Sequence, residues 1–313
     1  MKISGFSFVR NGINLYYPIV EAVKSILPIV DEFVIAVGEG DNDDETRQRI
    51  ANIGDPKIKI IDTQWDEKHY KGGIVNSIQT DIAMKECSGD WLFYVQADEV
   101  VHEKYLPAIK ARCAELVDNQ EVEALIFGYK HFWGDYDHYH AGHGWYKNEL
   151  RIVRNRPDIH SWQSAQSFRR FDYYDNPRQE DGHYKLKAAR VDAEIYHYGW
   201  VRPPHYMQNK RRALDTVHWG AKKAANYYNK SPNEFDYGPL NLLAQFKDTH
   251  PAVMAEMISK MNWKEKLQFS GKPDPSREPH KHEKFRNRAL TTIENILKGK
   301  ELGGFHNYIL LDV

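Results

Sequence analysis

The sequence contains little cysteine and no long apolar stretch. Among its 313 residues only Cys87 and Cys113 are cysteines, too few for a disulfide framework, which indicates a reducing compartment. No apolar run approaches the ~20 residues that a membrane-spanning helix needs. We also expect no signal peptide before Phe6, because the first residues read directly into a strand. These absences predict a soluble, cytoplasmic protein.

An excess of charge of either sign is also missing. Lys and Arg number 43 and Asp and Glu number 44, which gives a formal net charge of −1. Proteins that bind nucleic acids usually carry a basic excess, so no nucleic-acid partner is expected. The length allows a sizeable core, in one large domain or in one domain with an appendage. The 19 Tyr and 8 Trp residues suit a sugar-handling site, although aromatic rings also fill cores.

Apolar runs and amphipathic segments alternate in the first part of the chain. Short apolar runs predict strands, and segments with one apolar face predict helices. The expected strands are 3–9, 33–37, 58–61 and 91–95, and the expected helices begin near Pro18, at 45–54, after Gly72-Gly73 and at 104–117. This alternation predicts an α/β fold with a parallel, doubly wound sheet.

The pattern changes after residue 120. Strands are expected at 123–129, 150–153 and 189–196, between long aromatic and polar loops, and Pro203-Pro204 closes this region. The remaining sequence predicts helices over 206–225 and 240–269. The segment 270–282, which includes His280 and His282, is rich in Pro, Lys and His and predicts an exposed loop.

The most informative segment is the strand-like run from Trp91 that ends at Gln96-Ala97-Asp98-Glu99. A carboxylate at the carboxyl tip of a buried strand lies where ligands of α/β sheets usually bind. Asp98 follows the oxygen-bearing Gln96 by two residues, which suits a hard divalent cation that carries phosphates. The alternative is that Asp98 or Glu99 only caps a helix that starts at Glu103.

Several segments along the chain share the order and spacing of a known family. They are Phe8-Val9-Arg10-Asn11 with the helix after it, the acidic loop Val37–Thr46, Gly72-Gly73 with Asp81, Gly89-Asp90-Trp91, Gln96-Ala97-Asp98, Trp145–Arg154 and Ile195–Trp200. Over roughly residues 3–210 the chain therefore resembles a family 2 glycosyltransferase. The resemblance implies a GT-A fold, which is a Rossmann-like mixed sheet flanked by helices, here with a mainly helical C-terminal extension.

The resemblance also implies an organisation and an activity. Residues 1–205 would form the GT-A core, with a nucleotide-sugar half at about 1–100 and an acceptor half at about 101–205, and residues 206–313 would form the extension. The implied enzyme is an inverting, metal-dependent glycosyltransferase. It would move a sugar from a nucleotide diphosphate, UDP by default and GDP as the alternative, to a glycan or lipid-linked acceptor in surface polysaccharide synthesis.

Particular residues take their expected roles from the family motifs. The nucleotide sugar is expected to contact Val9, Arg10, Glu39, Asp41, Asp81, Gln96 and Ala97. Asp98 matches the metal-binding aspartate of the family's DXD motif, and His197 would complete the metal shell, or else be an ordinary core or surface histidine. Gln96 replaces the first acid of that motif, so one negative charge is missing. Mn²⁺ is expected over Mg²⁺ because an imidazole ligand suits manganese better.

A general base cannot be assigned by resemblance, since the segment 161–166 contains no carboxylate. Inverting transfer needs a carboxylate within hydrogen-bond reach of the acceptor hydroxyl. Asp137, in an aromatic loop, is the first candidate and Glu149 the second, and each can equally be a surface or structural acid. The His-rich loop 131–145 is expected to bind the acceptor, with a second metal site as the alternative.

Two other functions stay open on the sequence alone. A sugar-phosphate nucleotidyltransferase shares the broad sheet, but its Gly-rich basic loop is not supplied by Ser7–Gly12. A non-catalytic nucleotide- or carbohydrate-binding protein is favoured by Gln96 and by the missing base. The basic residues 210–212 and 222–223 are compatible with peripheral contact at the inner face of a membrane, or with an ordinary exposed helix face.

Overall fold

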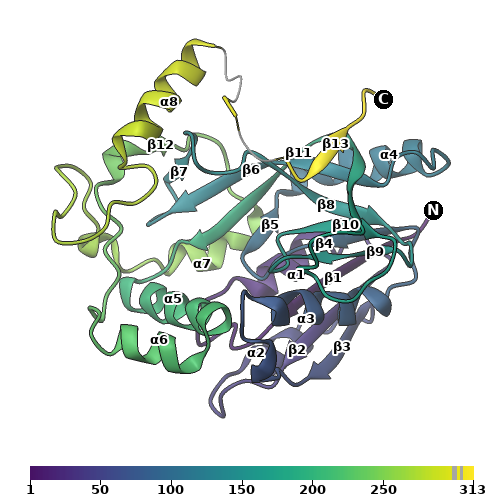
Figure 1. Cartoon of the computed structure of the whole chain (residues 1–313), viewed down its shortest axis with the longest axis horizontal. Helices are drawn as coiled ribbons and strands as arrows, with labels where there is room; N and C mark the ends of the chain where they lie inside the picture. Colours follow the sequence, from purple (N-terminus) through teal and green to yellow (C-terminus); the bar gives the residue numbers. More distant parts are fainter. Residues whose placement is uncertain (298–301, 304–305) are drawn as a thin grey trace.

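One mixed sheet of thirteen strands organises the computed structural model, which describes residues 1–297, 302–303 and 306–313 (Figure 1). The strands are β1 (Ile3–Val9), β2 (Glu32–Gly38), β3 (Ile58–Thr63), β4 (Trp91–Tyr94), β5 (Glu99–Val101), β6 (Ala124–Trp133), β7 (His138–His140), β8 (Asn148–Arg154), β9 (Ile159–Trp162), β10 (Ser167–Phe171), β11 (His183–Trp200), β12 (Ala244–Gln245) and β13 (Tyr308–Leu310). The helices are α1 (Ile19–Ile26), α2 (Thr46–Ala51), α3 (Ile74–Lys85), α4 (Leu106–Leu116), α5 (Pro204–Trp219), α6 (Ala221–Tyr228), α7 (Ala255–Ser259) and α8 (Phe285–Ile296).

The order of the main strands is β3-β2-β1-β4-β8-β6-β11-β10-β9. Strands β1 to β4 are parallel, β8 is antiparallel to β4 and β6, β6 is parallel to β11, and β10 and β9 are antiparallel. The expected fold class, an α/β mixed sheet flanked by helices, is confirmed. The wholly parallel sheet that strand-helix alternation predicts holds for β1 to β4, where helices connect the strands.

The helices cover both faces of the first half of this sheet. Side chains alternate between faces along a strand, so Phe33 and Ile35 of β2 pack with α1 and α4, whereas Val34 and Ala36 pack with α3. Coverage on both faces explains why these strands consist of nearly unbroken apolar runs in the sequence. The fold therefore leaves the ends of the strands, rather than their faces, open for a ligand.

Strand β1 marks the point where the connections change direction. The chain runs from β1 to β2 and β3 on one side, and then returns to place β4 on the other side of β1. At such a switch point the loops that follow the two strands separate, which leaves a crevice at the carboxyl ends of the strands. The residues after Val9 and Tyr94 border this crevice.

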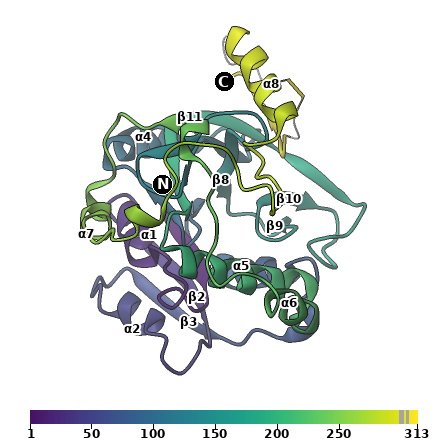
Figure 2. The ribbon, with the colours of Figure 1, turned by 90° about the vertical axis from the view of Figure 1, so that its left-hand side faces the viewer.

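The C-terminal part of the chain is joined to the sheet. Helices α5 and α6 lie side by side near α3, β13 pairs with β11, and α8 extends away from the rest of the molecule (Figure 2). Helices α5 and α6 agree with the prediction for 206–225. The predicted helix over 240–269 is largely wrong, since helical structure there is limited to α7 and short 3-10 turns, and β12 forms in the same stretch. Leu240 and Met254 are buried from 3-10 turns in that stretch, and Trp263 is buried just before another such turn.

The loop 270–282 forms as predicted, but His282 is not exposed. Its ring packs 5.2 Å from the ring of Trp133, and only 9% of its surface is accessible. A local pattern of Pro and Lys residues predicts a loop correctly. It does not show that the last residues of this loop turn inward against an aromatic cluster.

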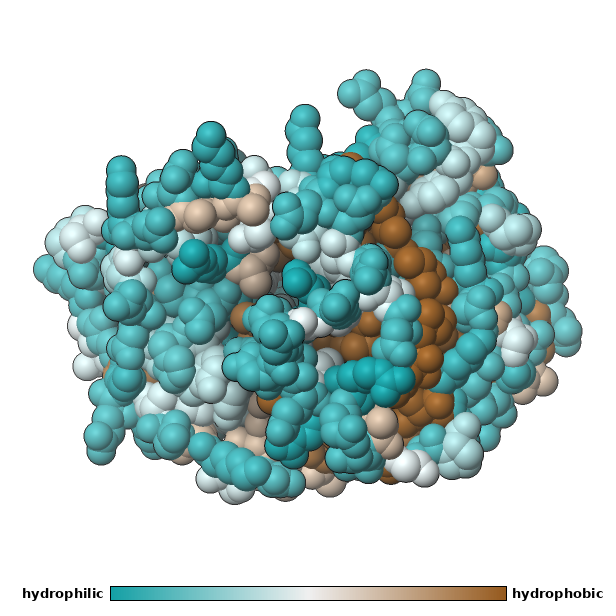
Figure 3. All heavy atoms as spheres, turned by 90° about the horizontal axis from the view of Figure 1, so that it is seen from below, coloured by the Kyte–Doolittle hydropathy of each residue, from teal (hydrophilic) through white to brown (hydrophobic). Residues whose placement is uncertain are grey.

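The surface is mostly hydrophilic in the view of Figure 3, with a curved band of hydrophobic atoms beside a hollow in its middle. In the described part of the chain no helix combines the length and the hydropathy that crossing a bilayer would require.

Candidate functional site

A cavity of about 590 Å³ opens at the carboxyl ends of β1 and β4. Part of its wall comes from the residues at and after these two strand ends, which are Phe8, Val9, Arg10, Asn11, Gln96, Ala97 and Asp98. Helix α5 contributes Met207, Lys210, Arg211 and Leu214, and strands later in the chain contribute Glu149, Arg151 and His197. The structure thus brings Val9, Arg10, Gln96, Ala97, Asp98, Glu149 and His197, all expected site residues, around one cavity.

The other expected site residues do not line this cavity. Glu39 and Asp41 are exposed on the loop after β2, and Asp137 is exposed between β6 and β7. Asp81 is buried in α3, where its Oδ1 accepts a hydrogen bond from the backbone N–H of Ser161 at 2.8 Å. Nucleotide binding by Glu39, Asp41 and Asp81 and a role of Asp137 as the general base stay predictions.

Helix α5 is held over the cavity by the loop that opens α3. The N–H groups of Gly72 and Gly73 donate to the carbonyl oxygens of His218 and Val217, each at 3.0 Å. Gly73 has a φ of +73°, and an added Cβ there would lie 2.8 Å from His218 Nε2 of α5 and 2.2 Å from Ser164 Oγ. Glycine is therefore needed at this position for the two segments to meet.

The segment that carries Asp98 is fixed by a buried ion pair between Arg151 and Glu99. Arg151 donates from Nε and Nη2 to the two carboxylate oxygens of Glu99, at 2.8 and 2.7 Å, and Tyr129 Oη donates to Glu99 Oε1 at 2.8 Å. Glu99 begins β5 rather than a helix, and His102 caps the 3-10 turn that follows. The helix-cap alternative for Asp98 and Glu99 is therefore wrong.

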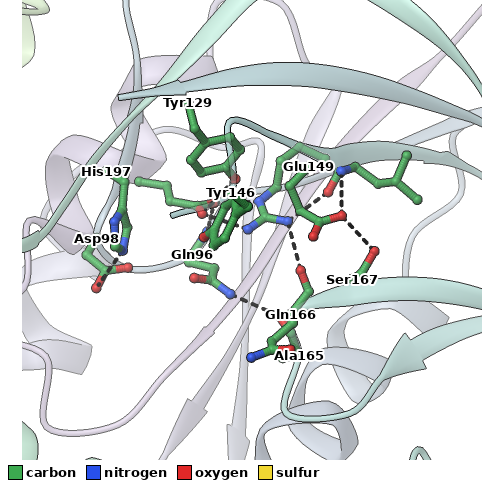
Figure 4. A network of polar contacts seen from close by, with 12 residues as sticks. Gln96, Asp98, Tyr129, Tyr146, Glu149, Ala165, Gln166, Ser167 and His197 are labelled. Atoms are coloured by element: carbon green, nitrogen blue, oxygen red, sulfur yellow. Dashed lines mark hydrogen bonds and ion pairs between the residues drawn. The ribbon is translucent and has the colours of Figure 1, made fainter. Parts of the chain in front are cut away.

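Asp98 and His197, which 99 positions of sequence separate, lie next to each other. His197 Nε2 is 3.7 Å from Asp98 Oδ2, and Figure 4 shows the ring directed at the carboxylate. On its other side, His197 Nδ1 is 3.0 Å from His131 Nδ1, and His131 Nε2 is 2.8 Å from the carbonyl oxygen of Tyr146. The parallel pairing of β6 with β11 places the two histidines opposite each other.

This chain of contacts assigns the proton positions. Burial, and then the neighbouring His197, lower the pKa of His131 well below its ordinary value, so His131 is neutral. A carbonyl oxygen only accepts, so His131 Nε2 carries the proton and its Nδ1 accepts from His197 Nδ1–H. His197 Nε2 is therefore the atom that is left to face Asp98.

Lys210 of α5 forms the closest contact of the Asp98 carboxylate. Its Nζ donates to Asp98 Oδ2 and to the carbonyl oxygen of Gly199, both at 2.7 Å. Burial opposes ionisation of Asp98, but Lys210 and His197 outweigh it and hold the pKa of Asp98 well below its ordinary value. Burial lowers the pKa of Lys210 to about 8 against the opposing effect of Asp98. Both groups are thus charged at neutral pH.

These residues do not fit a metal site built by the protein. The described residues hold no group of three or more His, Cys, Asp or Glu side chains that could bind one ion. The two expected ligands are adjacent, yet the Lys210 ammonium already lies against Asp98 Oδ2 and would repel a second cation. Glycine at position 199 keeps a side chain away from the pair, because a Cβ there would lie 2.4 Å from His197 Nε2 and 2.8 Å from Asp98 Oδ2. Metal binding by Asp98 and His197 stays a prediction.

Glu149 is a buried carboxylate in the wall of the same cavity. Its Oε1 accepts from Ser167 Oγ and from the backbone N–H of Leu150, both at 2.9 Å, and its Oε2 accepts from Asn307 Nδ2 at 2.8 Å. Burial raises the pKa of Glu149, and these hydrogen bonds together with the charge of Arg151 oppose the rise. A carboxyl group with a raised pKa in a cavity is suited to proton transfer.

Aromatic rings that the sequence did not single out also line the cavity. They are Tyr17, Trp65, Tyr70, Tyr146 and Trp200. Arg10 lies among them, since its Nη1 donates to Tyr70 Oη at 3.1 Å and its guanidinium is 5.8 Å from the centre of the Trp65 ring. Trp65 follows β3 closely, so the strand-end argument used for Asp98 could have found it. No local signal distinguished Lys210.

Comparisons with known proteins found similar solved structures only. No protein-family model matches the chain, and no curated protein matches it in sequence. TarS from S. aureus (residues 1–349) is 14% identical, with a TM-score of 0.35, over 69% of this chain and 65% of that chain. A second TarS structure, in complex with UDP, is 15% identical, with a TM-score of 0.35 and the same coverage.

Another similar structure is glucosyl-3-phosphoglycerate synthase from Mycobacterium tuberculosis in complex with Mn²⁺, UDP and phosphoglyceric acid. It is 16% identical, with a TM-score of 0.30, over 41% of this chain and 43% of that chain. This chain thus covers less than two thirds of the length of either protein. We draw no functional conclusion from likenesses of this degree.

Proposed function

We propose that this protein transfers a sugar from a nucleoside diphosphate donor to an acceptor hydroxyl group. The observation that carries the proposal is the position of Asp98, at the tip of β4 in a cavity at the switch point of the sheet, against a cation from α5. A sugar nucleotide needs an anion site beside flat apolar surfaces. This cavity offers Arg10, Lys210 and Arg211 together with six aromatic rings.

In this proposal the donor lies across the cavity from β1 towards β8. The base and ribose lie against Trp65 and Tyr70, next to Arg10. The diphosphate lies at Lys210 and Arg211, where two cations of α5 face the cavity. The sugar then extends towards the end that Glu149 lines, where an acceptor hydroxyl can reach its anomeric carbon.

The chemistry that we propose is a single displacement. The acceptor oxygen forms a bond to the anomeric carbon from the side opposite the diphosphate. The bond from that carbon to the phosphate oxygen breaks, its electron pair leaves with the diphosphate, and the configuration inverts. Glu149 accepts the proton of the acceptor hydroxyl, as a buried carboxylate with a raised pKa can do. We propose UDP as the carrier and a glycan or lipid-linked molecule of surface polysaccharide synthesis as the acceptor.

Calorimetry with UDP and GDP, followed by a hydrolysis assay on a panel of their sugar conjugates, tests the proposal. Wild-type protein should bind either UDP or GDP. It should also hydrolyse the sugar conjugate of that nucleotide slowly, which releases the free nucleotide. Trp65→Ala should weaken binding about tenfold, since stacking of a base on an aromatic ring is worth about 1–3 kcal/mol. Trp219→Ala, at an exposed tryptophan at the end of α5, is the matched control and should bind as wild type does.

A second candidate is a non-catalytic protein that binds sugar nucleotides. One observation favours it, which is that both oxygens of Glu149 already accept hydrogen bonds from neighbouring groups. Tight nucleotide binding without hydrolysis or transfer for any acceptor would support this alternative over the enzyme.

A further inference from the structure

Lys210 lies where the family resemblance would put a divalent ion. Its Nζ is 2.7 Å from Asp98 Oδ2, and the side chains of Lys210 and Asp98 are 10% and 8% exposed. The two residues are 112 positions apart in sequence, so the pair exists only because α5 packs over the carboxyl ends of β1 and β4. An ammonium group held this firmly is part of the site and not a solvated surface charge.

Several contacts fix the position of the Lys210 ammonium. It donates to Asp98 and to the carbonyl oxygen of Gly199, and it lies 4.9 Å from the centre of the Tyr17 ring. These contacts use two of the three N–H groups of a lysine ammonium. The third remains for a ligand in the cavity, which Lys210 lines.

We infer that Lys210 supplies the fixed positive charge for the diphosphate of the donor, in place of a divalent metal ion. The inference rests on the proposed function. In it, Asp98 is a positioning residue, which holds the ammonium in place and keeps it charged. His197, whose Nε2 faces the same carboxylate at 3.7 Å, borders the pair from β11.

The charge balance of the site supports this assignment. An aspartate with a divalent ion carries one net positive charge, whereas Asp98 with Lys210 carries none. Arg211, the next residue of α5, also lines the cavity and restores the missing positive charge. Gln96, at the first position of the DXD motif, is neutral. The site therefore has one negative charge fewer that a metal ion would have to offset. The site thus attracts a diphosphate with the charges of its own side chains.

Calorimetry with UDP in a chelating buffer and in Mn²⁺ tests the inference on wild type and Lys210→Met. Wild type should bind UDP with the same affinity, within about twofold, in both buffers. The variant should bind about 10- to 100-fold more weakly in the chelator, as expected for the loss of one charged hydrogen bond. It should regain affinity in Mn²⁺, because the vacated Asp98 and His197 can then accept the ion. A purely structural role for Lys210 would give no such rescue.

Two further variants complete the test. Asp98→Asn with Lys210→Met keeps the pair neutral, so it should fold, bind UDP weakly and show no rescue by Mn²⁺. Lys222→Met, at an exposed lysine of α6, should behave as wild type. If wild type binds UDP only with Mn²⁺, the inference is overturned while the proposed function stands. If wild type binds neither UDP nor GDP in either buffer, both are overturned.

Discussion

At the scale of single residues, burial separates Glu149 from Asp137, the two acids that the sequence offered as candidates for the general base. Asp137 is exposed in the turn between β6 and β7, whereas Glu149 is 5% exposed and lines the cavity. We therefore place Glu149 before Asp137 as the candidate general base, which reverses the order that the sequence suggested. A base must reach the proton that it removes, and only Glu149 lies in the cavity.

We predict that Glu149→Gln slows transfer or hydrolysis of the sugar nucleotide by about 10²- to 10⁴-fold, the usual contribution of a general base. The amide keeps the shape of the side chain, so the affinity for UDP should change by less than about twofold. Both quantities can be measured on one protein sample, by calorimetry and by the rate of UDP release.

Asp137→Asn is the matched control for this variant and should keep the wild-type rate. Equal rates for Glu149→Gln and wild type would remove Glu149 from the mechanism. They would leave the binding-protein alternative as the better account of its three hydrogen bonds.

At the scale of elements, the conformation of the loop between β4 and β5 depends on β8, a strand that follows it by about fifty residues. Arg151 of β8 is 1% exposed and reaches under this loop to the fully buried Glu99 at the start of β5. The two hydrogen bonds of the pair fix the loop from inside the protein. Asp98 thus owes its orientation to a buried ion pair, whose Arg151 also lines the cavity.

We predict that Arg151→Met lowers the free energy of unfolding by about 3–5 kcal/mol, because it leaves the Glu99 carboxylate buried without its partner. Chemical denaturation monitored by circular dichroism measures this loss. Replacing both members, Arg151→Met with Glu99→Leu, should recover much of the stability, since no isolated charge remains. Nucleotide affinity should stay reduced in the double variant because the loop has lost its anchor. A loss below about 1 kcal/mol for the single variant would contradict this account.

At the scale of the whole molecule, Glu32 connects three segments of the central sheet. Its Oε1 accepts from Ser4 Oγ of β1 at 2.5 Å and from the N–H and Oγ of Ser88, just before β4, at 2.7 and 2.8 Å. Burial raises the pKa of Glu32, but these hydrogen bonds outweigh it and lower the pKa to about 2. The carboxylate form therefore holds β1, β2 and the entry to β4 together.

We predict that this contribution to stability is lost in acid. The pKa of Glu32 is lower in the folded state than its value of 4.5 in the unfolded chain. The stabilisation is therefore complete above about pH 4.5 and declines as the pH falls towards 2. The difference in the free energy of unfolding between wild type and Glu32→Gln should be large at pH 7 and should shrink at pH 3. Glu67→Gln, at an exposed glutamate, should show no such change. A difference that does not depend on pH would exclude this role for Glu32.

The sequence by itself determined the first half of the sheet and the strand end that carries Asp98. The runs that became β1, β2, β3 and β4 are local signals, because burial on both faces demands apolar side chains at consecutive positions. The position of Asp98 after such a run followed from the same signal. The seven expected residues at the cavity were found because strand ends and motif order are visible in the sequence.

Only the tertiary structure decided that Lys210 meets Asp98. Lys210 belongs to a basic helical stretch, and its neighbour Arg212 is exposed. Which residue of such a stretch faces a cavity depends on how the helix packs, and α5 is placed by contacts with the loop before α3. The pairing of His131 with His197 likewise needs the parallel register of β6 and β11. Contacts between distant segments are set by packing of the whole chain, which no local pattern encodes.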